Sequence, residues 1–293
     1  MAKIRSFISI ENLDPEICNQ LVDKTLLLYN NQLPYSIKNQ FVTSLFFEPS
    51  TRTHLSFQLA AAKLGIHLCS LDKNNSSIQK GESYLDTFLN LNALGFSHAI
   101  IRLKDEFKLK EMQSQLENHL VPIKLISAGE GMISHPSQAL LDFCLIEKYF
   151  KSTQPVTILY IGDLAHSRVY SSHLQWHKYF PHFKCLTHDL LSENPLEEKL
   201  KIADVVYLFR PQVERHSQET MLSLETYTKK FCITMERFQL LKKTSIVMHP
   251  GPNYKNVEFD DSLLFNEKFK IMEQVSIGVF ARMAIYLYCM GEL

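Results

Sequence analysis

Three hydroxyl groups and one guanidinium stand together at residues 50–53, which read Ser50, Thr51, Arg52 and Thr53. They follow an apolar run and precede a stretch with helical spacing of leucines, so we expect them at a helix N-terminus. Backbone amides and the helix dipole favour an anion there, and a guanidinium can bind phosphate oxygens in pairs. The segment predicts a phosphate-binding loop. The alternative is an ordinary helix cap, with Ser50 as N-cap and the other side chains in solvent.

Two more polar segments precede predicted helices. Residues 76–83 (SSIQKGES) contain a lysine and a glycine, and taken alone they are typical of a solvated loop. In residues 134–138 (SHPSQ), His135 and Gln138 are three positions apart and face the same way at a helix start. A histidine there can donate to a developing oxyanion, and a glutamine can hold an amide-like group. A lone histidine at a cap is more often structural, so its role depends on neighbouring groups.

The second half of the chain places arginines directly after predicted strands. Arg168 ends the segment at residues 162–168 (GDLAHSR), and Arg210 begins the segment RPQVER, which also contains Gln212. A buried arginine is unusual without a partner carboxylate, so both side chains are candidates for binding an anionic ligand. A third strand is followed by residues 249–252 (HPGP), a rigid turn whose backbone is expected to face the same site.

Several common functions lack their sequence markers. There is no GxGxxG, GxxxxGK[ST], GxSxG or HExxH, the patterns of dinucleotide oxidoreductases, P-loop NTPases, α/β-hydrolases and zincins. The 31 Lys and Arg balance the 31 Asp and Glu, so no diffuse basic field is available for nucleic acid or a membrane surface. The six cysteines are scattered without a CxxC pair, which argues against a zinc cage or a redox motif.

The 293 residues suggest two domains, and apolar runs of strand length alternate with helical patterns throughout. The predicted strands are residues 41–47, 66–71, 99–103, 121–126, 156–161, 183–187, 205–209 and 246–249. The predicted helices are residues 51–64, 84–94, 106–119, 135–150, 168–179 and 275–290. This alternation predicts an α/β fold of two doubly wound parallel-sheet domains joined by two long helices. Sites in such sheets lie at the carboxyl ends of strands, where the polar segments above fall.

The polar break at residues 151–155 separates the two predicted domains. We expect one domain at residues 1–134, with residues 275–293 packing back on it. A linking helix at residues 135–149 leads to the second domain at residues 150–274. The first residues carry charges without a following apolar run, and no stretch is apolar enough to span a membrane. We therefore expect a soluble, cytoplasmic protein.

Taken in order, these segments resemble the aspartate/ornithine carbamoyltransferase family. The motifs STRT, SSxQKGES, HPSQ, GDxxHSRV, RxQxER and HPGP all occur between residues 46 and 252, and QVSIGVFARMA is similar to the family's C-terminal helix. The RxQ pair and the HPGP turn are similar to the members that use aspartate. Members that use ornithine carry a His-Cys-Leu-Pro turn and an Asp-x-x-x-Ser-Met-Gly segment, which this sequence lacks.

The resemblance implies a reaction in which carbamoyl phosphate and L-aspartate give N-carbamoyl-L-aspartate and phosphate, a step of pyrimidine (UMP) synthesis. It implies no metal and no organic cofactor. The first domain would then bind carbamoyl phosphate and the second would bind aspartate.

The resemblance also implies a role for each candidate residue. Carbamoyl phosphate would be bound by Ser50, Thr51, Arg52, Thr53, Ser76, Lys80, Arg102, His135, Gln138, Gly251 and Pro252. The catalytic residues would be Arg52, Thr53, Lys80, Arg102 and His135. Arg102 would bridge the phosphate and the carbonyl oxygen, and His135 with Thr53 would donate to that oxygen. Gln138 would hold the carbamoyl amino group. Aspartate would be bound by Lys80, Arg168, Arg210 and Gln212.

The resemblance further implies a homotrimer with shared active sites, because Ser76 and Lys80 would reach into the neighbouring subunit. Glu48 would pair with an arginine of the second domain when the enzyme closes. A regulatory chain or a dihydroorotase partner is left open.

Three positions depart from the family pattern. STRTR reads STRTH at His54, the usual RH after the third strand reads Arg102-Leu103, and Val-Asn-Arg-Gly is replaced by residues 253–256 (NYKN). Two alternatives stay open. One is a carbamoyltransferase that uses ornithine or another amine, and the other is a non-catalytic member that serves as a scaffold.

Overall fold

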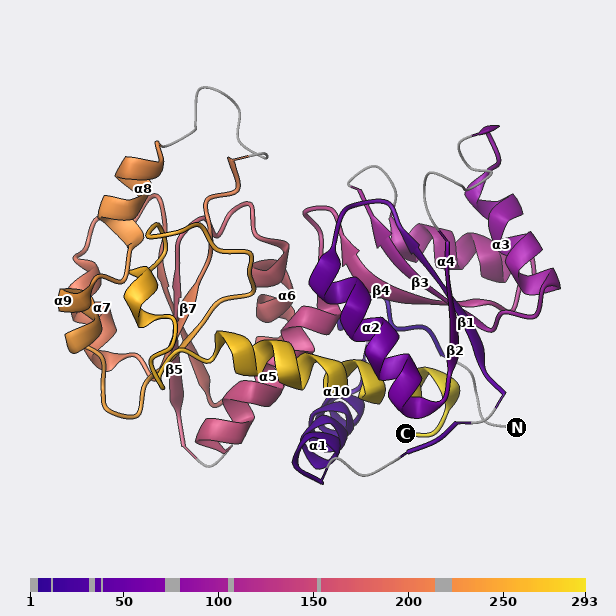
Figure 1. Cartoon of the computed structure of the whole chain (residues 1–293), viewed down its shortest axis with the longest axis horizontal. Helices are drawn as coiled ribbons and strands as arrows, with labels where there is room; N and C mark the ends of the chain where they lie inside the picture. The colour runs from indigo at the N-terminus through magenta and orange to yellow at the C-terminus, as the bar shows by residue number, and fades with distance from the viewer. Residues whose placement is uncertain are drawn as a thin grey trace. The chain divides into compact units, whose positions relative to one another are not determined.

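The computed structural model describes residues 5–11, 13–31, 35–37, 39–71, 80–104, 108–151, 154–213 and 223–293. The chain divides into two compact units (Figure 1). The first unit consists of Met1–Cys144, Ser171–Trp176 and Ser276–Leu293, and the second consists of Leu145–Tyr170 and His177–Val275. Each unit is built on a four-stranded, all-parallel sheet. The predicted fold class, two doubly wound α/β domains joined by long helices, is confirmed.

The first unit has the strand order β2-β1-β3-β4. Its elements are α1 (Pro15–Asn31), β1 (Phe41–Phe46), α2 (Thr51–Leu64), β2 (His67–Leu71), α3 (Tyr84–Ala93), β3 (His98–Leu103), α4 (Leu109–Asn118) and β4 (Lys124–Glu130). Every residue of β3 is buried, as expected for a strand covered on both faces. Phe88 of α3 and Met112 of α4 pack with Ile101 of β3 in one apolar cluster.

Three long helices contribute residues to both units: α5 (Pro136–Phe150), α6 (Arg168–His177) and α10 (Ile271–Met290). The last turns of α10 belong to the core of the first unit. Tyr286 is fully buried, its ring meets Phe57 of α2 edge-on at 5.9 Å, and its hydroxyl donates to the Phe57 carbonyl. Cys289 accepts a hydrogen bond from the Arg5 amide through its carbonyl, so the N-terminal segment is joined to the same helix.

The strand order of the first unit reverses between β1 and β3. The chain leaves β1 for the edge strand β2 and then returns to β3 on the other side. Phe46 is registered against Arg102, so the carboxyl ends of these two strands lie next to each other. Because the loops after the two strands diverge to opposite sides, such a switch point is where α/β sheets bind ligands. Residues 50–53 and Arg102 therefore belong to one end of the sheet.

The second unit repeats this arrangement with the order β6-β5-β7-β8. Its remaining elements are β5 (Val156–Ile161), β6 (Phe183–His188), α7 (Leu196–Ile202), β7 (Val205–Leu208), α8 (Leu224–Phe231), α9 (Met235–Gln239), β8 (Ile246–Met248) and the 3₁₀ helix η4 (Asp261–Leu263). The switch point lies between β5 and β7, where Ile161 is registered against Leu208. The segments that carry Arg168 and Arg210 start just beyond these two residues.

Most predicted elements are found within a few residues of their expected positions, but the fourth strand was placed wrongly. The sequence predicted residues 121–126, whereas β4 runs over Lys124–Glu130. The strand continues through Gly129 because the Glu130 amide bonds to the Ser134 carbonyl and the buried Glu130 carboxylate accepts the Leu109 amide. Four helices were not predicted: α1, α7, α8 and α9. The functional labels and boundaries of the two domains stay predictions.

Among the described residues, no helix combines the length and the apolar character that a membrane crossing requires.

Candidate active site

The predicted phosphate loop forms the start of α2. Ser50 occupies the N-cap position, yet its side chain makes no capping hydrogen bond within the part of the chain that the structure describes. Thr51 and Arg52 are exposed in the first turn, while Thr53 is buried. A helix N-terminus presents backbone amides to its surroundings, and these together with the helix dipole favour an anion. Ser50 thus has the N-cap position that the alternative gave it, but not the capping hydrogen bond of its side chain among the described residues.

Arg102 and His135 meet at Gly129. A Cβ atom on Gly129 would lie 3.2 Å from Arg102 Nη1 and 3.4 Å from His135 Cδ2, and the φ of Gly129 is +116°. Both side chains are almost buried, at 7% and 6% exposure. Only glycine tolerates this backbone and this approach. The structure thus brings a guanidinium and an imidazole, one from β3 and one from the start of α5, to the same point.

Arg102 is held from two sides. Its Nη1 donates to the Ala128 carbonyl at 3.1 Å, and its Nε lies 3.2 Å from Oε2 of Glu48. Glu48, which the resemblance pairs with an arginine of the second domain, thus forms an ion pair with an arginine of its own unit. The guanidinium plane is therefore oriented by protein groups.

His135 and Gln138 have separate supports in the first unit. The Ser172 hydroxyl accepts the His135 amide at 2.8 Å. The side-chain nitrogen of Gln138 donates to Asp142 at 3.1 Å, and Asp142 also pairs with His173 at 3.0 Å, both groups being fully buried. The Asp142 carboxylate thus fixes which end of the Gln138 side-chain amide is the donor.

Lys80 is exposed in a turn before α3. The residues that follow it in the motif stabilise that helix. Gly81 has a φ of +95°, Glu82 accepts from Thr87 and Asn90, and Ser83 is the N-cap that accepts the Asp86 amide. The GES part of the motif is thus structural, and the lysine projects from a well-capped helix start. Ser76 lies outside the described residues.

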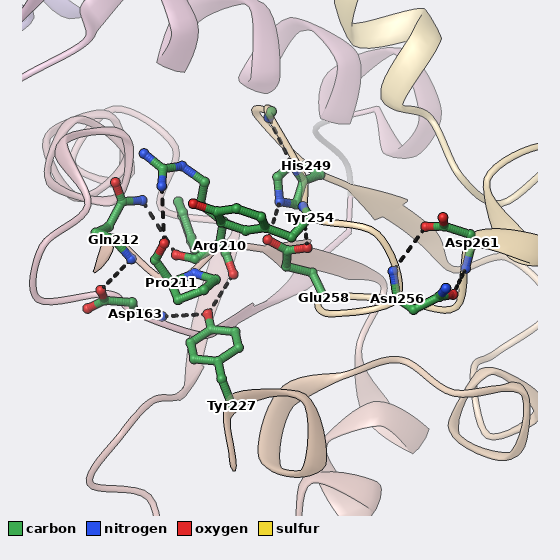
Figure 2. A network of polar contacts seen from close by, with 12 residues as sticks. Asp163, Arg210, Pro211, Gln212, Tyr227, His249, Tyr254, Asn256, Glu258 and Asp261 are labelled. Carbon is green, nitrogen blue, oxygen red and sulfur yellow. Dashed lines mark hydrogen bonds and ion pairs between the residues drawn. The ribbon is translucent and has the colours of Figure 1, made fainter. Parts of the chain in front are cut away.

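Gly162 and Asp163 organise the carboxyl ends of β5 and β7. A Cβ on Gly162 would lie 2.2 Å from the Tyr227 hydroxyl and 2.6 Å from the Phe209 carbonyl, so no larger residue fits. The Tyr227 hydroxyl accepts the Asp163 amide at 3.1 Å and donates to the Phe209 carbonyl at 2.7 Å. This single hydroxyl links the two strand ends (Figure 2). It fixes the spacing of the loops that follow them.

The candidate residues for binding aspartate follow the two strand ends that the Tyr227 hydroxyl joins. The Asp163 carboxylate accepts the Gln212 amide at 3.0 Å, and its other oxygen lies 2.7 Å from His166 Nδ1. Gln212 is buried, and Arg210 is half-buried with Nη1 donating to the Pro211 carbonyl at 3.1 Å. Arg168 is the first residue of α6. Arg168, Arg210 and Gln212 therefore all belong to the switch point of the second sheet.

The turn after β8 is fixed by His249. The Gly251 amide donates to His249 Nδ1 at 2.8 Å, so in the neutral ring the proton is on Nε2, which lies 3.9 Å from Oε1 of Glu258. Oε2 of Glu258 accepts the Tyr254 amide at 2.9 Å. Pro252 is exposed within this turn, and Gly251 is half-buried. Figure 2 shows His249, Tyr254 and Glu258 grouped together.

Glu258 is expected to make folding stability depend on pH. Burial raises its pKa from 4.5 to about 7. Between these values the folded chain keeps a proton that the unfolded chain has lost, so stability falls as the pH rises from about 4.5 to about 7. A pKa shift of this size corresponds to a loss of about 3 kcal/mol in the free energy of unfolding at high pH, and Glu258→Gln removes this loss. Urea unfolding at pH 4.5 and pH 8 should show the variant gaining stability relative to wild type by about that amount at the higher pH.

A matched control for this prediction is Glu225→Gln, an exposed glutamate at the start of α8. The free energy of unfolding of Glu225→Gln should match that of wild type at both pH values. Parallel pH profiles for Glu258→Gln and wild type would contradict the raised pKa.

Comparison with known proteins agrees with this geometry. The profile of the aspartate/ornithine carbamoyltransferase carbamoyl-P binding domain matches residues 5–148, and that of the Asp/Orn binding domain matches residues 186–289. The aspartate carbamoyltransferase catalytic subunit of Listeria welshimeri is 35% identical over 96% of this chain and 94% of its own. The chain belongs to the aspartate/ornithine carbamoyltransferase family. The catalytic subunit of Sulfurimonas denitrificans is 38% identical over 85% of this chain and 86% of its own.

Solved structures of the family have the same fold. Aspartate transcarbamoylase from Trypanosoma cruzi, crystallised with carbamoyl phosphate and aspartate, has a TM-score of 0.81 and 26% identity, covering 97% of this chain and 96% of that one. The same enzyme with N-(phosphonacetyl)-L-aspartic acid has a TM-score of 0.79 and 25% identity, over 97% and 95%. The likeness therefore extends over both units.

Two departures from the family pattern have a local explanation. His54, in place of the second arginine, packs its ring 4.7 Å from that of Phe46 and places Nε2 3.1 Å from the Ser70 hydroxyl. Asn256 stands where the family has glycine and has a φ of +53°. Asparagine is one of the few residues that tolerate this left-handed conformation. His54 thus has its own contacts in the first unit, and Asn256 is compatible with the backbone at its position. Leu103, in place of histidine, is 1% exposed and belongs to the apolar cluster of the first unit, where a leucine side chain needs no polar partner.

The sequence did not reveal the residues that support these candidate carbamoyltransferase groups. They are Gly129, Asp142, Ser172, His173, Tyr227 and Glu258. Gly129 and Asp142 flank the HPSQ motif. A glycine and a carboxylate so close to this motif were a usable signal for supporting residues. Tyr227 had none, because it is an ordinary helical aromatic 64 residues from Asp163. Within the described ranges, no three His, Cys, Asp or Glu side chains converge as a metal site requires.

Proposed function

We propose that the protein transfers the carbamoyl group of carbamoyl phosphate to the amino group of L-aspartate, giving N-carbamoyl-L-aspartate and phosphate. The observation that carries this proposal is the meeting of Arg102 and His135 at Gly129, at the end of the sheet where β1 leads into the start of α2. A dianionic phosphate fits the helix start, and two buried donors fit the carbonyl oxygen that becomes negative during transfer. The names of the relatives support the same acceptor and donor.

The proposed mechanism needs only positioning and charge stabilisation. The amino nitrogen of aspartate attacks the carbamoyl carbon, and a C–N bond forms while the carbonyl oxygen takes negative charge. Arg102 and His135 stabilise that oxygen with Thr53, and the oxygen of the Gln138 side chain accepts from the carbamoyl amino group. The C–O bond to phosphate then breaks, and the amine proton leaves with the phosphate group or to solvent. Residues 50–53 bind the departing phosphate.

In the second unit, the proposed roles concern aspartate. Arg168 would bind its α-carboxylate, and Arg210 with Gln212 its side-chain carboxylate. Gly251 and Pro252 would contribute backbone carbonyls to the carbamoyl amino group. The first unit would then be the carbamoyl-phosphate-binding domain and the second the aspartate-binding domain. We place the reaction in pyrimidine biosynthesis and the protein in the cytoplasm.

We further propose a homotrimer in which Ser76 and Lys80 of one chain complete the site of the next. The first unit offers a surface for self-association at its edge strand β2, where Leu71 of the strand is 37% exposed and Leu55 and Leu59 of α2 are 56% and 49% exposed. An open strand edge flanked by apolar side chains favours contact with another chain. A regulatory chain or a dihydroorotase partner stays a prediction.

The choice of acceptor tests the proposed function. With carbamoyl phosphate present, aspartate should give a carbamoylated product and release phosphate, whereas ornithine should not. The reason is that Arg210 would attract a side-chain carboxylate and repel the ammonium group of ornithine. Product formation is followed by colorimetric ureido assay and by phosphate release. Turnover of ornithine in preference to aspartate would show a different carbamoyltransferase, and no turnover with either amine would favour a scaffold.

A further inference from the structure

The ring of Tyr254 lies beside the guanidinium of Arg210. Cζ of Arg210 is 6.0 Å from the ring centroid, within the range of a cation–π contact (Figure 2). Tyr254 is 39% exposed, so the ring is at the surface and does not belong to the core of the second unit. Together with the bond from Arg210 Nη1 to the Pro211 carbonyl, the ring gives the guanidinium a second point of contact.

The backbone around Tyr254 is fixed at both ends of its loop. The Tyr254 amide donates to Oε2 of Glu258, a carboxylate that is only 1% exposed. Two residues on, the Asn256 amide donates to Oδ1 of Asp261 at 3.2 Å, and the Asp261 amide donates back to Oδ1 of Asn256 at 2.9 Å. Figure 2 shows both attachments on the same stretch of chain. The position of the ring therefore follows from a well-anchored backbone.

We infer that Tyr254 is a positioning residue that orders Arg210 for the side-chain carboxylate of the acceptor. An arginine side chain has many rotamers, and ordering it when the substrate binds opposes binding. A ring that already restrains the guanidinium reduces this loss and so increases affinity for the acceptor alone. This inference rests on the proposed function, since it assigns Arg210 to the aspartate carboxylate. Tyrosine replaces the asparagine of the family pattern at this position, and asparagine has no ring to place against a guanidinium.

Steady-state kinetics of Tyr254 variants test the inference. For Tyr254→Ala and Tyr254→Leu we expect the KM for aspartate to rise about 3- to 5-fold, the size of a partly exposed cation–π contact. The kcat should stay within about 2-fold and the KM for carbamoyl phosphate should not change, because the contact acts on Arg210 and on no group of the first unit. Tyr254→Phe keeps the ring face and should restore the wild-type KM for aspartate.

Two comparisons separate positioning from a general structural effect. Phe265→Ala removes an aromatic ring that is 89% exposed in the same unit, and it should leave both KM values unchanged. In an Arg210→Ala background, Tyr254→Ala should have no further effect on the KM for aspartate, because the group that it orders is gone. Thermal unfolding of each variant monitors folding.

An unchanged KM for aspartate in Tyr254→Ala would overturn the inference. An equal rise in the KM for aspartate with and without Arg210, or an equal rise in the KM for both substrates, would also overturn it. If the wild-type protein does not use aspartate at all, it is the proposed function that fails, and this outcome is visible before any variant is made.

Discussion

Lys80→Ala and His135→Ala are each expected to be nearly inactive when purified alone and to regain activity when they are mixed. By our proposal His135 donates to the developing oxyanion, and the loss of such a donor lowers kcat by roughly 100- to 1000-fold. Lys80 is exposed in the turn before α3 and, by our proposal, acts in the site of the neighbouring chain. A mixed trimer would then contain one site with an intact Lys80 and an intact His135.

The expected recovery of activity follows from the arrangement of three chains in a closed ring. If the chains of the two variants assemble at random in equal amounts, about one quarter of the sites are native, so activity should return to about that fraction of wild type. The measurement is turnover after reversible dissociation and reassociation of the mixture, with trimer composition determined by native mass spectrometry. Each variant treated alone should stay inactive. Mixed trimers that remain inactive would show that Lys80 serves its own chain.

Arg210→Ala is expected to weaken the use of aspartate strongly while leaving the binding of carbamoyl phosphate unchanged. Removing one partner of a partly buried charged hydrogen bond is worth about 2 to 5 kcal/mol, which corresponds to at least a 30-fold fall in kcat/KM for aspartate. The guanidinium is half-buried beside Pro211 and Tyr254, so water replaces it poorly. Initial rates with each substrate varied in turn separate the two effects.

Arg210→Lys is the matched variant, because it retains the charge but loses the planar fork that binds a carboxylate in pairs. Its activity should fall between those of wild type and Arg210→Ala. Equal loss of aspartate and carbamoyl phosphate affinity would contradict the assignment of Arg210 to the acceptor.

The fold was predictable because its strands are buried along their length and its polar segments fall where strands end. Arg210 was placed correctly just after β7 by that logic, whereas Arg102, near the carboxyl end of β3, was named only through the family resemblance. β4 was misplaced because Gly129 and Glu130 look like loop residues. In the structure, position 129 must be glycine because the side chains of Arg102 and His135 approach it closely. The buried Glu130 carboxylate accepts the Leu109 amide.

The supporting contacts were harder to predict because they join residues that are distant in sequence. Tyr227 bonds to Asp163 and Phe209, and His173 bonds to Asp142, through pairings that depend on how the elements pack. Hydrophobic periodicity contains no information about such pairings. The sequence identifies which groups can do chemistry, whereas their orientation depends on tertiary contacts that are long-range.

The entry of α10 into the core of the first unit has a consequence for how the protein is made. Tyr286 packs on Phe57, and the Cys289 carbonyl accepts the Arg5 amide, so a helix that follows the second unit in the chain completes the core of the first unit. While a nascent chain emerges from the ribosome, the residues of the second unit become available earlier than this closing helix. The apolar surface of the first unit that α10 covers therefore stays exposed until α10 itself has emerged.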